Sequence, residues 1–271
     1  MRLWDNHMHC AFSGDSNTPP EVMIAAAKEK QLAGITFTDH LDWDYKEDPG
    51  LFDLDLATYQ QQIRQLSQVF SEGSFTILCG LELGLQPNLV PKHQQLFNDY
   101  SFDYVIGSTH VVNGRDPYYP SFFDHRTSRQ AYTEYYEAVY ANLMAFDGFD
   151  ALGHLDYIFR YGPHNNDPQD TYHGYSEIID AILQAIIRKD IALEVNTGAF
   201  RCHMQEPNPG SIILKRYREL GGQLITIGAD AHKPVHVGLG YDLLPNILRD
   251  CGFTEYVVYK NRIPYPHLIA I

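Results

Sequence analysis

The sequence predicts an α/β barrel built on a parallel sheet, and three observations lead to that fold. Short β-branched or apolar runs alternate along the chain with longer segments of helical pattern, an order typical of parallel sheets. Seven such runs can be counted, and nearly all of them end at a histidine or an acidic residue. No repeat, low-complexity tract or Pro/Gly-rich linker divides the 271 residues, so we expect one domain over residues 1–271.

The expected elements can be justified in chain order. Thr18-Pro19-Pro20-Glu21 supplies a cap, helix-opening prolines and a capping-box glutamate ahead of VMIAAAKEKQLA. Ser128 similarly precedes RQAYTEYYEAVYANLMAF, whose aromatic residues recur at helical spacing and are expected in the core. The longest irregular stretches follow the second, fourth and fifth strands, and loops of that length are usually binding loops. The seven strands are expected at residues 3–7, 34–40, 75–82, 102–110, 149–154, 191–196 and 223–230.

Composition excludes several classes of partner. Hydrophobic residues make up 44% of the chain, enough for a sizeable core. With 20 Lys plus Arg against 34 Asp plus Glu and no basic stripe, a nucleic-acid partner is disfavoured. No apolar stretch is long enough for a membrane span, and the first residues do not resemble a secretory leader. The four cysteines lie far apart without CxxC spacing, which favours reduced thiols in the cytoplasm.

The residues at the strand ends indicate a metal site. Six of the seven expected strands end in, or one residue past, a His, Asp or Glu, and the remaining strand carries Glu194 and Asn196. The carboxyl ends of barrel strands meet at one mouth, so these side chains should converge there. His7 and His9 share one side of the first strand, as do Asp230 and His232 after the last. The candidate ligands are His7, His9, His40, Glu82, His110, His154, Asp230 and His232.

The chemistry of this set limits the metal. Nitrogen and oxygen ligands without cysteine suit zinc, manganese or iron. The set exceeds what one tetrahedral ion needs, so we expect two or three divalent ions with a bridging carboxylate. Cys10 has the opposite strand parity to His9 and is left out. For most of the other seven histidines among the 13, we expect packing or surface roles.

The order of the motifs resembles the PHP phosphoesterase superfamily. The shared features are HxH at the start, TDH, a GxE-type third strand, STH, GHLD and a final DAH, over residue 7 to about residue 240. The resemblance implies a distorted (β/α)7 barrel, TIM-like, with a trinuclear metal cluster at the carboxyl ends of the strands. HMHCAFSGD, with Asp15 six residues after His9, GHLDYIFRYG and EVNTGAFR are similar to the histidinol-phosphatase branch.

The resemblance also implies a role for each ligand. Many superfamily members have a histidine where this chain has Asp15, so this ligand departs from the common pattern. His7, His9, Glu82 and Asp230 are implied for one ion, Glu82, His110 and His154 for a second, and Asp15, His40 and His232 for a third.

The activity implied is hydrolysis of a phosphomonoester, L-histidinol phosphate, to L-histidinol and phosphate in histidine biosynthesis. A metal-bridging hydroxide would be the nucleophile, so no separate catalytic protein base is expected. Arg160 and Arg201 lie near the metal loops and are expected to bind the phosphate, with Lys233 as a weaker candidate. The alternative is that both arginines are ordinary surface residues.

The organic half of such a substrate carries an amine and an imidazole. Acidic and aromatic residues follow His40 and His110, and one hypothesis pairs a carboxylate there with the ammonium group. The simpler interpretation is a solvated acidic loop in an acidic protein. The candidates are Asp42, Asp44 and Asp116, among Trp43, Tyr45, Tyr118 and Tyr119.

Three other functions are consistent with parts of the pattern. The first is the same chemistry on another phosphomonoester, such as a sugar phosphate, a nucleotide or a phosphotyrosine peptide. The second is an amidohydrolase-type deaminase or lactonase, which usually has a bridging carbamylated lysine where this chain has Glu82. The third is a metal-binding module of a replication assembly, in which we would expect several ligands to be missing. The phosphatase is favoured over all three, and the oligomeric state is not readable from the sequence.

Overall fold

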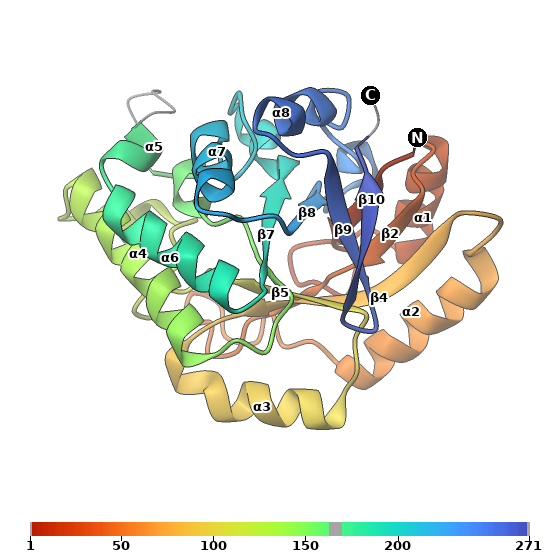
Figure 1. Ribbon diagram of the computed structural model, residues 1–271. Helices are drawn as coiled ribbons and strands as arrows, with labels where there is room; N and C mark the ends of the chain where they lie inside the picture. Colours follow the sequence, from red (N-terminus) through yellow and green to blue (C-terminus); the bar gives the residue numbers. More distant parts are fainter. Residues whose placement is uncertain (1, 163–169, 270–271) are drawn as a thin grey trace.

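Seven parallel strands form the centre of the fold, which is shown by a computed structural model that describes residues 2–162 and 170–269. Each strand pairs with the next in parallel, as the sequence predicts, and together they make a nearly closed, TIM-like barrel (Figure 1). The strands are β1 (Trp4–Met8), β2 (Gly34–Phe37), β4 (Thr76–Gly84), β5 (Tyr104–Ser108), β6 (Ala151–Leu152), β7 (Ala192–Asn196) and β8 (Ile225–Gly228).

The barrel closes where the first strand meets the segment after the last. Met8 forms a parallel bridge with Ala231, and the His9 N–H donates to the Ala231 carbonyl at 2.9 Å. The Asp230 N–H donates to the His7 carbonyl at 2.8 Å. The HxH and DxH segments therefore lie side by side, as expected for neighbouring first and last strands.

One short strand was not expected. β3 (His40–Leu41) pairs with β4 beyond the end of β2, because His40 lies opposite Glu82 in the parallel register. The chain thus leaves the sheet at β2 for two residues and rejoins it next to β4. This return places the TDH histidine at the carboxyl end of the barrel.

Helices cover the outside of the barrel (Figure 1). On α6, Ile179, Ile182, Leu183 and Ile186 are buried at the spacing of one helix face, which fixes that face against the sheet. The helices are α1 (Pro20–Glu29), α2 (Leu56–Phe70), α3 (Val90–Asp99), α4 (Ser128–Ala145), α5 (Asp170–His173), α6 (Ser176–Arg188), α7 (Ser211–Glu219) and α8 (Leu244–Asp250). The 3₁₀ turns are η1 (Pro87–Leu89), η2 (Pro120–Phe123), η3 (Tyr157–Arg160), η4 (Thr197–Cys202) and η5 (Pro234–His236).

Both predicted helix caps are wrong in detail. Pro19 is the N-cap of α1 and makes no side-chain cap bond, whereas the Thr18 hydroxyl donates to the His232 carbonyl at 3.1 Å. The tertiary contact with the loop after β8 has taken the hydroxyl that the sequence assigns to the helix. At α4 the cap is Thr127, one residue earlier than Ser128, and it forms a capping box with Gln130.

The C-terminal segment is a β-hairpin. β9 (Glu255–Lys260) and β10 (Ile263–Leu268) pair in antiparallel register. Val257 and Tyr259 join a small apolar cluster with Tyr104 and Ile106 of β5. Since Tyr104 is the first residue of β5, the hairpin packs against the amino end of the barrel, away from the predicted site.

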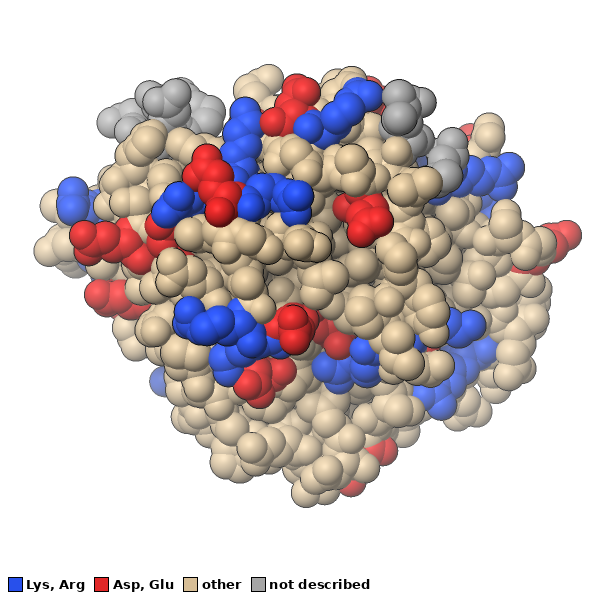
Figure 2. Space-filling view, viewed as in Figure 1, with Lys and Arg blue, Asp and Glu red and all other residues tan. Residues whose placement is uncertain are grey.

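The surface gives two further observations. On the face in Figure 2, basic and acidic side chains are interspersed rather than gathered into a single-sign stripe. Within residues 2–162 and 170–269, no helix has the length and apolar character needed to cross a bilayer.

Candidate metal centre

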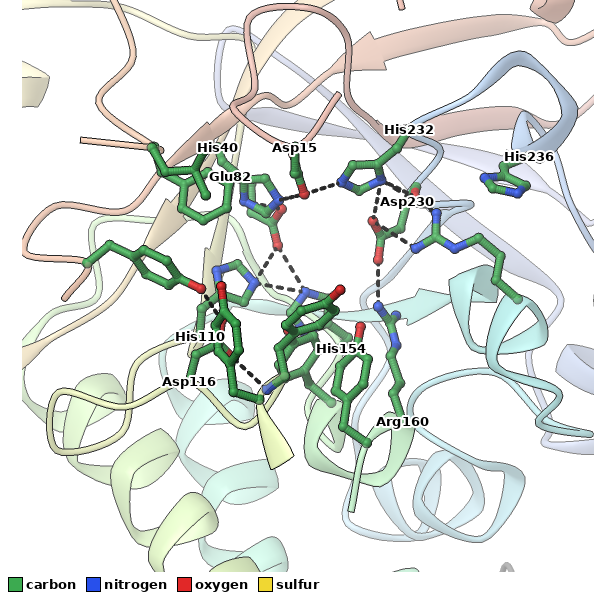
Figure 3. Close-up of a pocket in the computed structure, with 18 residues that line it drawn as sticks. Asp15, His40, Glu82, His110, Asp116, His154, Arg160, Asp230, His232 and His236 are labelled. Carbon is green, nitrogen blue, oxygen red and sulfur yellow. Dashed lines mark hydrogen bonds and ion pairs between the residues drawn. The ribbon is translucent and has the colours of Figure 1, made fainter. Parts of the chain in front are cut away.

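A cavity of about 470 Å³ lies at the carboxyl ends of the strands. Most of the side chains predicted to be ligands point into it from different strands, and both predicted arginines reach its wall (Figure 3). His7 and His9 lie just beneath, fully buried. The predicted residues that line the cavity are Asp15, His40, Glu82, His110, His154, Arg160, Arg201, Asp230 and His232.

Glu82 lies at the centre of the cluster, and its two oxygens face different histidines. Its Oε2 lies 3.0 Å from Nε2 of His7 and 3.3 Å from Nε2 of His9. Its Oε1 lies 2.9 Å from Nε2 of His154 and 3.3 Å from Nε2 of His110. A carboxylate with this arrangement can bridge two cations.

Burial and charge act in opposite directions on Glu82. Burial alone would raise the pKa of its carboxyl, but positive charge on His7 and His40 outweighs burial and holds that pKa well below its usual range. The same competition holds at Asp230, where Arg201 and Arg160 outweigh burial and lower the pKa. Both carboxylates are therefore ionised, as metal ligands must be.

Hydrogen bonds to the outer nitrogens of His7 and His9 turn their inner nitrogens toward each other. Nδ1 of His7 lies 2.5 Å from Oε1 of Glu194, so it donates to that carboxylate. Nδ1 of His9 lies 3.1 Å from the Ser13 hydroxyl, which itself donates to Asp39 at 3.0 Å and so accepts from His9. The two Nε2 atoms are left 3.0 Å apart.

This contact is a test of whether a metal fits. With both rings neutral, two nitrogen lone pairs and a carboxylate oxygen at about 3 Å would repel one another, so the contact needs a positive group among them: a proton on His7, or a metal ion in its place. His7, His9 and Asp230 also offer ligand atoms that all lie within 4.8 Å of one another. The donor set is therefore that of a cation site, and its nitrogen and oxygen composition suits a divalent transition metal.

Two further groups of side chains have the same character. Glu82, His110 and His154 offer ligand atoms within 4.8 Å of one another. On the other side, Nε2 of His232 lies 2.9 Å from Oδ2 of Asp15, and Nε2 of His40 lies 3.7 Å from the same oxygen. Asp15 is the most open of the predicted ligands, with its side chain 37% exposed.

The acidic residues of the loop after β3 divide into two roles. Asp42 is buried, and its Oδ1 accepts from Nδ1 of His110 at 2.8 Å. It therefore orients that histidine and is not part of the cavity wall. Burial would raise the pKa of Asp42, but the charge and hydrogen bond of His110 lower it to about 2. Asp44 is exposed and outside the cavity wall, whereas Asp116 lines the cavity beside Tyr45.

The two arginines are partly occupied by protein partners. Arg160 donates from Nη1 to Asp230 Oδ2 at 2.7 Å and makes two further bonds to asparagine side chains. Arg201 donates to the Asp230 carbonyl, and its Nη2 lies 3.4 Å from Asp230 Oδ1. Lys233 is exposed and is not part of the cavity wall.

Three residues of this region were missed as members of the site. Glu194 orients His7 and also accepts the His154 N–H at 2.8 Å; its place at the end of the sixth predicted strand was the available signal. Asp39 accepts from the Cys10 and Ser13 N–H groups and so shapes the loop after β1. His236 lines the cavity, although the sequence offered no strand end to indicate it.

Residues 5–198 match the PHP domain family. A probable histidinol-phosphatase of Clostridium acetobutylicum is 31% identical over 267 residues, which is 97% of this chain and 99% of that protein. A histidinol-phosphatase of Lactococcus lactis is also 31% identical, over 96% of both chains.

Solved structures agree with the sequence matches. The crystal structure of histidinol phosphate phosphatase from Lactococcus lactis, in complex with zinc, L-histidinol and phosphate, superimposes with a TM-score of 0.88. It is 30% identical and covers 97% of this chain and 99% of its own. A putative histidinol phosphatase of Listeria monocytogenes is 19% identical with a TM-score of 0.76 over 88% of this chain and 98% of its own, a likeness of fold. This chain belongs to the PHP domain family.

Proposed function

We propose that this chain is a metal-dependent phosphomonoesterase that hydrolyses L-histidinol phosphate to L-histidinol and phosphate in histidine biosynthesis. The observation that carries the proposal is the likeness, over nearly the whole chain, to a structure that binds zinc, L-histidinol and phosphate. The bridging position of Glu82 supports the same conclusion, because a carbamylated lysine of the amidohydrolase type has no counterpart there.

We assign two or three divalent ions, zinc, manganese or iron, to the cavity. When bound, such ions lower the pKa of water towards neutrality and offset the charge on the phosphoryl oxygens. The chain's own part is to hold the ligands ionised and oriented, through Glu194, Ser13 and Asp42. The proposed ligands are His7, His9, Asp15, His40, Glu82, His110, His154, Asp230 and His232.

The phosphate half of the substrate would contact the two arginines. Arg160 has five N–H groups, and three of them bond to described residues, which leaves one on each Nη nitrogen without a partner among residues 2–162 and 170–269. Arg201 is 19% exposed, and its Nη2 lies 3.4 Å from Oδ1 of Asp230, whereas Arg160 contacts Oδ2. Charge-assisted bonds from both would stabilise the equatorial oxygens of the transition state.

The organic half would contact the acidic and aromatic wall. Asp116 is 5% exposed and lines the cavity, and it accepts from the Tyr45 hydroxyl at 2.8 Å and the Tyr118 N–H at 2.7 Å. Burial raises the pKa of Asp116, so a substrate ammonium beside it would restore the charge balance that burial disfavours. Asp116 is therefore the carboxylate we assign to the amine, in place of Asp42.

We further propose that residues 1–271 act as one catalytic domain in the cytoplasm on a small-molecule phosphomonoester. The four cysteines are free thiols, which suits a reducing compartment.

Phosphate release tests the proposal. The protein would be assayed with histidinol phosphate, a sugar phosphate, a nucleoside monophosphate and a phosphotyrosine peptide, before and after chelation and metal restoration. We expect strong preference for histidinol phosphate, loss of activity on chelation, and recovery with zinc or manganese. Equal activity on all four substrates would keep the chemistry but refute the substrate, and no metal-dependent release would refute the enzyme.

A further inference from the structure

Two buried asparagines from different segments hold the guanidinium of Arg160. Asn208 Oδ1 accepts from Nε at 2.8 Å, and Asn196 Oδ1 accepts from Nη2 at 2.7 Å. The backbones of the two asparagines also pair, with N–H to O distances of 2.8 and 2.9 Å in the two directions. We call Asn196 and Asn208 the asparagine clamp. Both are fully buried, so the clamp excludes water from one edge of Arg160.

The far side of the clamp ends on a second carboxylate. Asn208 Nδ2 donates to Oδ1 of Asp156 at 2.7 Å, and the Gly210 N–H lies 3.3 Å from Oδ2 of Asp156. Asp156 thereby fixes which end of the Asn208 amide faces Arg160, because only the amide nitrogen can donate to a carboxylate. The Asp156 carboxylate thus holds the Asn208 amide, which in turn holds the Arg160 guanidinium at the cavity.

The chemical type of the acceptors matters for an arginine that binds an anion. A second carboxylate on Arg160 would offset its remaining positive charge and weaken its attraction for phosphate. Neutral amides fix the orientation of the planar guanidinium and leave its positive charge in place. Asp230 is the one carboxylate that contacts Arg160 directly among the described residues, and Arg201 shares it.

We propose that Asn208 is a positioning residue that aims the two remaining N–H groups of Arg160, which have no partner in the described part of the chain, at the phosphoryl group. Asp156 fixes the orientation of the Asn208 amide. This inference rests on the proposed function only in taking a phosphoryl group as the ligand of the cavity. Asn196 contacts Glu194 and Asp230 as well, so Asn208 is the arm of the clamp that can be tested cleanly.

The test is binding of inorganic phosphate to the zinc-loaded, full-length protein by titration calorimetry. The variants are Asn208→Ala, Arg160→Gln and the double variant, with zinc content and thermal unfolding measured for each. We expect Asn208→Ala to weaken phosphate binding about 10-fold, since hydrogen bonds to charged groups have that magnitude. The double variant should bind no more weakly than Arg160→Gln alone, because both changes remove one contact.

Two further variants separate positioning from general destabilisation. Asn142→Ala removes another buried asparagine, which donates to Thr109 and not to the clamp, and should leave phosphate affinity unchanged. Asn208→Asp keeps the side-chain volume but sets a second carboxyl group against Asp156, so the pair must share a proton or repel. Arg160 then faces an acidic acceptor in place of a neutral amide, and phosphate binding should weaken even if Asn208→Ala does not fold.

The outcomes also distinguish this inference from the proposed function. Full phosphate affinity in both Asn208 variants, or additive losses in the double variant, would overturn the positioning role. A wild-type protein that binds phosphate but releases none from histidinol phosphate would refute the proposed substrate. The role of Asn208 would then be decided by the phosphate affinities of the variants. A zinc-loaded protein that binds no phosphate would overturn both.

Discussion

Replacing Glu194 with glutamine is the sharpest test of how the metal ligands are oriented. Glu194 is 1% exposed, and its Oε1 accepts from His7 Nδ1 at 2.5 Å. Its Oε2 accepts two bonds, from the His154 N–H at 2.8 Å and from Asn196 Nδ2 at 3.2 Å. Glutamine has the same shape but one acceptor oxygen, so it can accept from His7 or from the two donors on the other side, but not from both sides. If its amide nitrogen faces His7, the imidazole proton moves to Nε2, the atom that faces Glu82 and His9.

Either orientation of the new amide has a cost that can be estimated. With the wrong tautomer, His7 is lost as a ligand, and changes to such orienting partners lower metal affinity about 10- to 100-fold. With the amide reversed, the buried His154 N–H loses its acceptor, which costs about 1–3 kcal/mol of stability. We therefore expect the most weakly bound zinc ion of Glu194→Gln to have an affinity about 10- to 100-fold lower than in the wild type. Excess zinc should restore the activity.

The assay is zinc retention against a chelator series, followed by phosphate release at limiting and saturating zinc. Glu177→Gln is the matched control, because Glu177 is exposed on α6 and should behave as wild type. Unchanged zinc affinity together with an unchanged free energy of unfolding in Glu194→Gln would refute the reasoning, since the glutamine cannot accept from both His7 and the His154 N–H. Lost activity that excess zinc does not restore would show a role other than ligand orientation.

Three other predictions follow from single contacts. In Gly84→Ala the new methyl group would overlap Asp42 Oδ1, so His110 should lose its acceptor and zinc affinity should fall about 10-fold in the same chelator series. Tyr59→Phe should lower the free energy of unfolding by about 1–3 kcal/mol in urea titrations, because the buried Tyr59 hydroxyl lies 2.9 Å from two strand carbonyls. Chelation should lower the thermal unfolding midpoint, because it leaves Glu82 and its histidines without their cation.

The barrel could be predicted from the sequence because its strands are marked twice. Each is a short apolar run, and most are closed by a residue that has to face the barrel mouth. His110 and His154 end two such runs, and both point into the cavity. The β3 return and the C-terminal hairpin could not be predicted in this way. β3 has only two residues, and the two prolines of β10 are unusual in a strand.

The helix caps and the loop acids were harder for a different physical reason. Thr18 has the side chain of a good cap, but a carbonyl after β8 competes for its hydroxyl. Asp42 lies in a loop that looks solvated, yet it is buried under His110. In both cases the deciding partner comes from a distant segment, and local patterns contain no information about it. Asn208 is a third example, 48 residues away from the arginine that it holds.

A rule for finding such partners does follow from the chemistry of histidine. A histidine that binds a metal through one nitrogen needs an acceptor for the N–H of the other. His7, His9 and His110 each have one, from a strand end, a nearby loop serine and a loop aspartate. Each predicted ligand without an assigned acceptor therefore points to a residue still to be found near it.

His40 and His154 depart from this rule, and His154 shows what can replace the acceptor. Its Nδ1 is buried and has no hydrogen-bond partner among residues 2–162 and 170–269, while its Nε2 faces Glu82. Its ring instead packs on Tyr157, with centroids 5.0 Å apart, and its backbone N–H is fixed by Glu194. Packing and a backbone bond can thus replace the side-chain acceptor. His154 is held by the same Glu194 that orients His7, so one carboxylate couples two ligand groups of the cluster.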